Sequence, residues 1–258
     1  MSLEQLKNPP IEEVVCGIVF DPIPQLDPLT IGWFAREVEA DFPRRQLQPA
    51  IGDSGSVFVG PTPPLRAWLV AEADDLLLQV QHDRFYLNWR ARGYEYPRCR
   101  DHDGKAGILR RATEEWDRFC AFVRREFDVS PTLRRLELAK IDHLVGGRDW
   151  SEQADLPTLL PVLRPLMDLS GSSGTRAAFH LSEASEVGRL TVSVNPPQER
   201  PRPDGEVREV VVIESRVTAS LSGDDLLAQL QTHNERLNEI FERLIPEEQR
   251  RLRFGGET

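Results

Sequence analysis

The sequence predicts an α+β fold in which antiparallel strands and two long helices alternate along one chain. Short apolar runs with period-two alternation recur in both halves of the chain, which is typical of strands. Two longer segments, 105–127 and 226–244, carry apolar residues at steps of three and four, which is typical of helices. The length of 258 residues suits one large domain, and we expect a single domain over 1–258.

The first half is expected to begin with a strand over 13–20. Both faces of this strand are apolar, so it suits a central position in a sheet. A short helix over 29–42 and a loop over 45–64 come next, and the half ends in the first long helix. Between the loop and that helix, strands are expected at 67–73, 76–81 and 85–90, with turns at 74–75 and 82–83.

The second half repeats this order. It begins with a strand over 133–144 and a short helix over 156–167, and it ends in the second long helix, where Ser222 and Asp225 resemble a capping box. Between them, strands are expected at 177–181, 190–194 and 210–219, with a flexible loop at 170–174 and a turn at 203–205.

This repeated order predicts an internal duplication, with pseudo-repeat halves at 8–128 and 131–246. Two duplicated β-α-β-β(-β)-α units would form antiparallel sheets with both long helices packed on one face. The element order resembles the TATA-box-binding-protein-like and helix-grip folds. A fold does not by itself define a function.

The composition restricts the expected partners and location. The net charge of −10 disfavours nucleic acid, because proteins that bind it neutralise phosphates with Lys and Arg. The sequence has neither an apolar stretch long enough for a membrane span nor a signal-peptide pattern at its start. Cys16, Cys99 and Cys120 are odd in number and widely spaced, so neither a disulfide framework nor a zinc site is expected. We therefore expect a cytoplasmic protein without membrane association.

Motifs that would indicate catalysis are weak. The run GDSGS at 52–56 resembles the nucleophile segment of trypsin-like serine proteases, but no histidine precedes it as the general base. A flexible turn is the favoured interpretation. The run DHD at 101–103 is too compact to surround a metal ion, so a solvated loop is favoured there. We expect no catalytic residue, no bound metal and no cofactor.

Polar side chains gather in the stretch 79–90, which provides the best candidate binding site. The candidates are Gln79, Gln81, Arg84, Asn88, Trp89 and Arg90, and Tyr86 could add stacking surface. One interpretation is a recognition strip for a polar ligand or for the backbone of a partner. The other, which we favour, is a buried hydrogen-bond network that fixes strand register, with Arg90 bound to a carboxylate or a helix C-terminus.

Two segments carry a resemblance to known proteins. They are NPPIEEV at 8–14 and LQVQHDRFYLNWR at 78–90, the latter followed by Tyr96-Pro97, and His233 and Phe241 fit the same pattern. In these residues the chain resembles a sporadically distributed bacterial family of uncharacterised proteins of about this length. The resemblance implies a patchily distributed, horizontally exchanged gene, a distribution common among accessory and defence genes. It implies no catalytic residue.

Together these observations favour a non-enzymatic binding or interaction protein that acts with a protein partner or as a homodimer. We expect an accessory component of a bacterial antiviral defence or mobile-element system. The alternative is a nucleic-acid- or nucleotide-binding module that uses the sheet face, with Arg84, Arg90, Arg134 and Arg135 as contacts. A hydrolase or nuclease built from dispersed acids is a third class that no motif supports.

Overall fold

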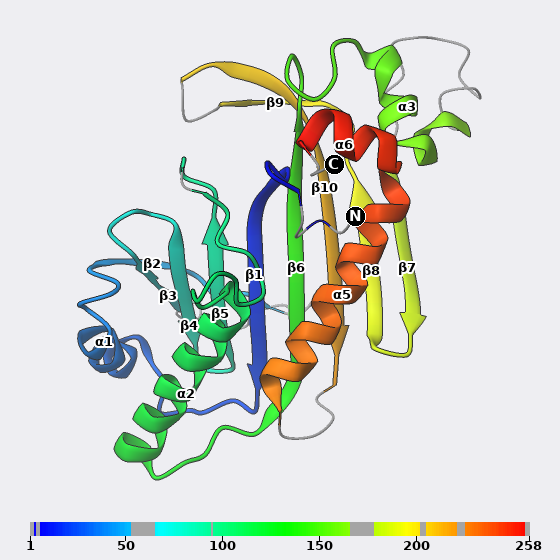
Figure 1. Ribbon diagram of the computed structural model, residues 1–258. Coiled ribbons are helices and arrows are strands. Elements are labelled where there is room, and N and C mark those ends of the chain that lie inside the picture. The colour runs from blue at the N-terminus through cyan, green and yellow to red at the C-terminus, as the bar shows by residue number, and fades with distance from the viewer. Residues whose placement is uncertain are drawn as a thin grey trace.

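The computed structural model describes residues 3, 6–52, 65–93, 95–165, 178–201, 205–220 and 225–255. These residues form an α+β fold built around one large antiparallel sheet, with the helices gathered on one side of it (Figure 1). The α+β prediction is confirmed at this level. None of the described helices is both long and apolar enough to cross a membrane.

The strands follow the predicted pattern closely. They are β1 (Ile11–Phe20), β2 (Arg44–Pro49), β3 (Leu65–Val70), β4 (Leu76–Gln81), β5 (Arg84–Arg90), β6 (Leu133–Val145), β7 (Phe179–Ser185), β8 (Gly188–Val194), β9 (Gln198–Pro201) and β10 (Val207–Ala219). Two of them were not predicted. The loop expected over 45–64 is wrong at its start, since β2 occupies 44–49, and β9 was also missed. Both strands are polar and exposed, so neither has the apolar alternation by which strands are recognised.

The helices are α1 (Pro28–Glu37), α2 (Ile108–Phe127), α3 (Leu156–Leu159), α5 (Leu226–Leu244) and α6 (Glu247–Phe254), with 3₁₀ turns at Gln153–Asp155 and Pro161–Leu163. The two long helices are confirmed, whereas α1 ends earlier than expected. The N-cap of α5 is Asp225, whose side chain accepts a hydrogen bond from the Ala228 N–H. The expected partner Ser222, the 170–174 loop, residues 203–204 and most of the 52–56 run lie outside the described residues.

The strand order of the sheet is β2-β3-β4-β5-β1-β6-β10-β8-β7, and β9 pairs with β10. The first strand of the N-terminal half, β1, pairs with its last strand, β5, and β4, β3 and β2 follow outward. The first strand of the C-terminal half, β6, pairs with its last strand, β10, and β8 and β7 follow outward. The two halves meet where β1 and β6 pair antiparallel.

One face of the sheet carries the main hydrophobic core. Side chains alternate between the two faces of a strand, so every second strand residue points toward α1, α2 and α5 (Figure 1). An aromatic cluster joins helix and sheet, with the Phe85 and Phe119 ring centroids 5.3 Å apart and those of Phe20 and Trp116 5.6 Å apart. We call the opposite side of the sheet the open face. Among the described residues it carries two small apolar clusters, one of which contains Val15, Tyr86 and Ala139.

Candidate functional site

The open face contains five of the six candidate residues. The register pairs Val15 with Asn88 and Gly17 with Tyr86, so alternate residues of β5 lie on this face. Pairing between β4 and β5 adds the glutamines of β4. The structure thus brings Gln79, Gln81, Arg84, Asn88 and Arg90 together. Trp89 points to the other face, where it packs against Tyr96, and so does not join them.

Gln79 is the centre of a continuous hydrogen-bond network. Its side-chain oxygen accepts from Arg66 Nη1 at 2.6 Å and from Trp68 Nε1 at 3.0 Å. Its Nε2 donates to Asn88 Oδ1 at 2.8 Å, and Asn88 Nδ2 donates to Glu13 Oε1 at 2.6 Å. Gln79 and Asn88 are buried. These contacts connect β3, β4, β5 and β1, and they agree with the interpretation that the polar residues fix strand register.

Gln81 holds the chain after β2 over the open face. Its Oε1 accepts from the Ile51 N–H at 2.9 Å and its Nε2 donates to the Ile51 carbonyl at 3.0 Å, as a paired backbone strand would. Ile51 packs on the cluster of Val15, Tyr86 and Ala139. Arg84 is buried nearby. Gln81 and Arg84 therefore lie beneath other parts of the chain rather than at the surface.

Arg90 binds a carboxylate at the end of strands β3, β4 and β5. Its Nη2 lies 2.7 Å from Asp74 Oδ1, in the turn between β3 and β4, and Arg44 and Arg92 bind the same carboxylate. Partial burial raises the pKa of Asp74, but the hydrogen bond from Arg92 and the charges of the three arginines outweigh this effect and lower it. Arg90 is thus one of three cations around one acid.

Glu137 of β6 organises the centre of the open face and was not predicted. It is buried, and its carboxylate accepts from Arg135 Nε at 2.9 Å and from Arg216 Nη1 at 3.2 Å. The Tyr86 hydroxyl donates to it at 3.4 Å. Burial and the charge of Glu137 raise the pKa of Tyr86. The alternation of Arg135 and Glu137 within β6 was a usable signal, but Arg216 lies on β10 and only the strand pairing brings it close.

The arginines named for the nucleic-acid alternative do not form one patch. Arg135 lies on the open face, Arg84 is buried beneath it, and Arg90 lies beside the turn between β3 and β4. Arg134 lies where the register between β1 and β6 shifts, and it pairs with Asp21.

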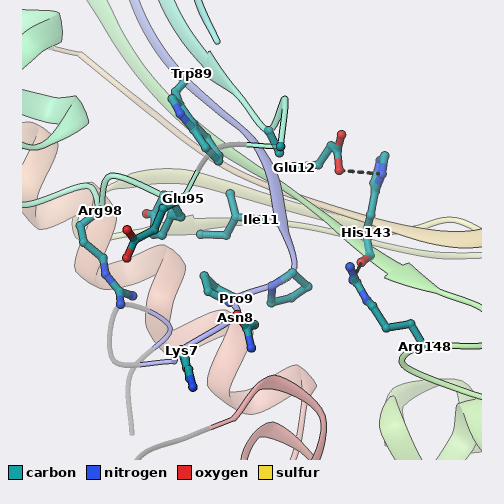
Figure 2. Close-up of a pocket in the computed structure, with 14 residues that line it drawn as sticks. Lys7, Asn8, Pro9, Ile11, Glu12, Trp89, Glu95, Arg98, His143 and Arg148 are labelled. Atoms are coloured by element: carbon teal, nitrogen blue, oxygen red, sulfur yellow. Dashed lines mark hydrogen bonds and ion pairs between the residues drawn. The ribbon is translucent and has the colours of Figure 1, made fainter. Parts of the chain in front are cut away.

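A pocket of about 350 Å³ lies at the N-terminal end of β1 (Figure 2). It is formed by residues 7–12, by the end of β5 with the loop that follows it, and by His143 and Arg148. Its wall contains Pro9, Pro10, Ile11, Trp89 and Tyr96. Trp89 therefore contributes to this pocket instead of the open face. The two segments that carry the family resemblance are adjacent here, because β1 and β5 pair side by side.

The core beneath α5 contains a third polar group of residues. Lys140 and Asp142 of β6 are fully buried, and Lys140 Nζ donates to Asn238 Oδ1 at 2.7 Å. Burial raises the pKa of Asp142 to about 7, although the charge of Lys140 opposes this effect. Oδ1 of Asp142 has no hydrogen-bond partner. Asp142 is therefore close to its protonation midpoint near neutral pH.

The described residues contain no group of three His, Cys, Asp or Glu side chains placed to hold a metal ion. In the 101–103 loop, Asp101 accepts from the Gly107 N–H and pairs with Arg110. Burial raises the pKa of the Cys120 thiol to about 12 and that of Cys16 well above its usual value. Neither thiol is ionised at neutral pH, so neither is an activated nucleophile.

The chain matches no protein-family model, and no curated protein sequence is significantly similar to it.

Proposed function

We propose that this protein is a non-enzymatic binding protein that docks a protein partner on the open face of its sheet. We further propose that it works in the cytoplasm as an accessory component of a bacterial defence or mobile-element system. The two halves of the chain are, in this proposal, a duplicated unit of TATA-box-binding-protein-like or helix-grip-like type. The matching outward strand orders of the halves support the duplication.

The observation that carries the proposal is the charge of the open face. Among the described residues outside the β9 ribbon, seven arginines lie on this side of the sheet, namely Arg44, Arg66, Arg84, Arg90, Arg135, Arg189 and Arg216, of which Arg84 is buried. They face five acids, namely Glu13, Glu137 and Glu214 on the strands and the turn residues Asp74 and Asp83, which pair with Arg44, Arg90 and Arg84. The whole chain has a net charge of −10. The contrast between the arginine-rich open face and the acidic chain as a whole favours a partner that presents a carboxylate-rich segment, since arginine binds carboxylates with two parallel hydrogen bonds.

The decisive experiment compares baits in extracts of the native host. The double variant Arg66→Gln/Arg216→Gln removes two cations from the open face, and Arg125→Gln, on helix α2, is a control on the helix side of the sheet. We expect the wild type and the control to retain the same acidic partner, in a salt-sensitive manner, and the double variant to lose it. Melting temperatures establish that both variants fold. Equal retention by all three baits contradicts the proposal.

Nucleic acid is the second candidate, because the same guanidinium groups bind phosphate. Fluorescence anisotropy with single- and double-stranded DNA and RNA tests it on the same three proteins. Binding that falls steeply with salt and disappears in the double variant would replace the protein partner with nucleic acid. Size-exclusion chromatography of the wild type tests the homodimer.

A further inference from the structure

The pocket at the N-terminal end of β1 has the dimensions and lining of a small-molecule site. Its volume of about 350 Å³ lies in the range of roughly 300–1,000 Å³ that such sites occupy. Its wall combines the apolar side chains of Ile11, Trp89 and Tyr96 with charged and polar side chains. Apolar and aromatic side chains together with convergent polar groups are typical of sites that bind organic molecules.

Cationic side chains reach the rim from three separate parts of the chain. Lys7 precedes β1, Arg98 lies in the loop before α2, and Arg148 follows β6. Figure 2 shows Lys7 and Arg98 on one side of Pro9, with His143 and Arg148 on the other. No ion pair joins the exposed ammonium of Lys7 to another residue in the described part of the chain. Within that part, it presents an unpaired positive charge at the cavity mouth.

The other charged groups at the rim are held in place. The guanidinium of Arg148 is fixed along one edge by buried Asp149, with Nε 2.9 Å from Oδ1 and Nη2 2.7 Å from Oδ2. Glu12 faces His143 at 3.5 Å. The carboxylate of Glu95 also lies at the rim. A group with one negative charge is therefore accommodated, whereas a polyanion is repelled by Glu95 and Glu12.

Arg98 is held in an uncommon backbone conformation. Its φ of +67° places a non-glycine residue in the left-handed region. The carbonyl of Arg98 accepts from the Ile108 N–H at 3.0 Å at the start of α2, and its Nη1 donates to the Leu6 carbonyl at 3.0 Å. The surrounding structure thus enforces this conformation, and such strained residues cluster at ligand sites.

We infer that this pocket binds an organic monocarboxylate of metabolite size, with its hydrocarbon part against Pro9, Ile11 and Trp89 and its carboxylate at Lys7 and Arg98. The assignment does not depend on the charge of the open face, because Lys7 and Arg98 lie outside the strands of the sheet. It also gives the cationic side chains at the rim a role, in a chain whose net charge is −10.

Calorimetric titration of the untagged protein tests the assignment with four probes. Indole-3-acetate and hexanoate supply an aromatic and an aliphatic carboxylate. Indole-3-ethanol keeps the ring without the charge, and acetate keeps the charge without a hydrocarbon part. We expect saturable binding of at least one of the two larger carboxylates at millimolar concentration or below, and much weaker binding of the ethanol analogue and of acetate.

Two variants separate this site from unspecific anion binding. Lys7→Glu reverses an exposed charge and should weaken carboxylate binding roughly tenfold or more while the protein stays folded. Lys105→Glu makes the same change on an exposed lysine outside the pocket and should bind as the wild type does. The assignment is overturned if neither larger carboxylate binds, if indole-3-ethanol binds equally well, if the two variants behave alike, or if adenosine monophosphate binds in place of the carboxylates.

Discussion

At the scale of single residues, the buried carboxyl of Asp142 has the clearest physical consequence. Its pKa of about 7 in the folded protein lies far above the ordinary value of 3.8. Between these values the folded state keeps a proton that the unfolded state has lost. The free energy of unfolding therefore falls as the pH rises through this window, and the contribution is fully present only below about pH 4.

We predict that Asp142→Asn removes this part of the pH dependence. The wild type should lose up to about 1.4 kcal/mol of stability per pH unit between pH 4 and 7, and the variant should not. Denaturant unfolding across this pH range measures the slope. Asp103→Asn, at an exposed loop carboxyl, is the control and should keep the wild-type slope. Identical slopes for wild type and Asp142→Asn would show that the carboxyl is ionised throughout.

A second residue-scale prediction concerns Gly17 of β1. A Cβ at this position would lie 2.2 Å from Cε1 of Tyr86, so the ring must move. We expect Gly17→Ala to cost about 1–3 kcal/mol of stability through overpacking and through loss of the Tyr86–Glu137 hydrogen bond. In the variant that also carries Tyr86→Ala, the two losses should be less than additive. Full additivity would contradict a direct contact.

At the scale of elements, the sequence predicted the helices and strands that bury an apolar face. The α2 helix and strands β1, β4 and β10 have clear periodicity, and the structure places them near the expected bounds. The edge strand β2 has none, because an exposed edge does not need apolar residues. The polar residues of β4 and β5 were recognisable as a group. Their partners Glu13, Arg66 and Glu137 were not, because each lies on another strand and only the register brings it close.

We predict that members of this network differ in their effect on stability. Gln79→Ala removes one hydrogen-bond partner each from Arg66 Nη1, Trp68 Nε1 and Asn88 Oδ1, and each unsatisfied buried group costs about 1–3 kcal/mol, so a total loss near 3 kcal/mol is expected. Arg90→Ala should cost about 1 kcal/mol, because Asp74 keeps two other cations.

Thermal melts separate these effects. Gln46→Ala, on exposed β2, is the control and should melt as the wild type does. A larger drop in melting temperature for Arg90→Ala than for Gln79→Ala would mean that the hydrogen-bond network around Gln79 does not stabilise the fold. An unchanged melt of Gln79→Ala together with lost partner binding would instead make these residues the binding site.

At the scale of the whole molecule, the two halves depend on each other. Their first strands pair with each other along most of their length in the middle of the sheet. A separated half would expose one long, largely apolar strand edge, which is a template for aggregation. Stability is therefore expected of the assembled sheet rather than of either half alone.

We predict that fragments 1–129 and 130–258 do not fold alone but associate when produced together. The cut lies between α2 and β6, outside both elements. Circular dichroism and size-exclusion chromatography of each fragment and of the co-expressed pair measure this. A stable, monomeric N-terminal fragment would show that β1 tolerates an open edge.

The end of the chain is tied to the pocket by two backbone hydrogen bonds. The Lys7 N–H donates to the carbonyl of Gly255, the residue after α6, at 3.3 Å. The Asn8 N–H donates to the carbonyl of Phe254, the last residue of α6, at 3.0 Å. Both donors belong to residues that line the pocket. A ligand that steadies Lys7 and Asn8 must therefore also slow the amide hydrogen exchange of α6, by thermodynamic linkage. The last helix of the chain becomes a reporter of pocket occupancy that can be read without a label on the ligand.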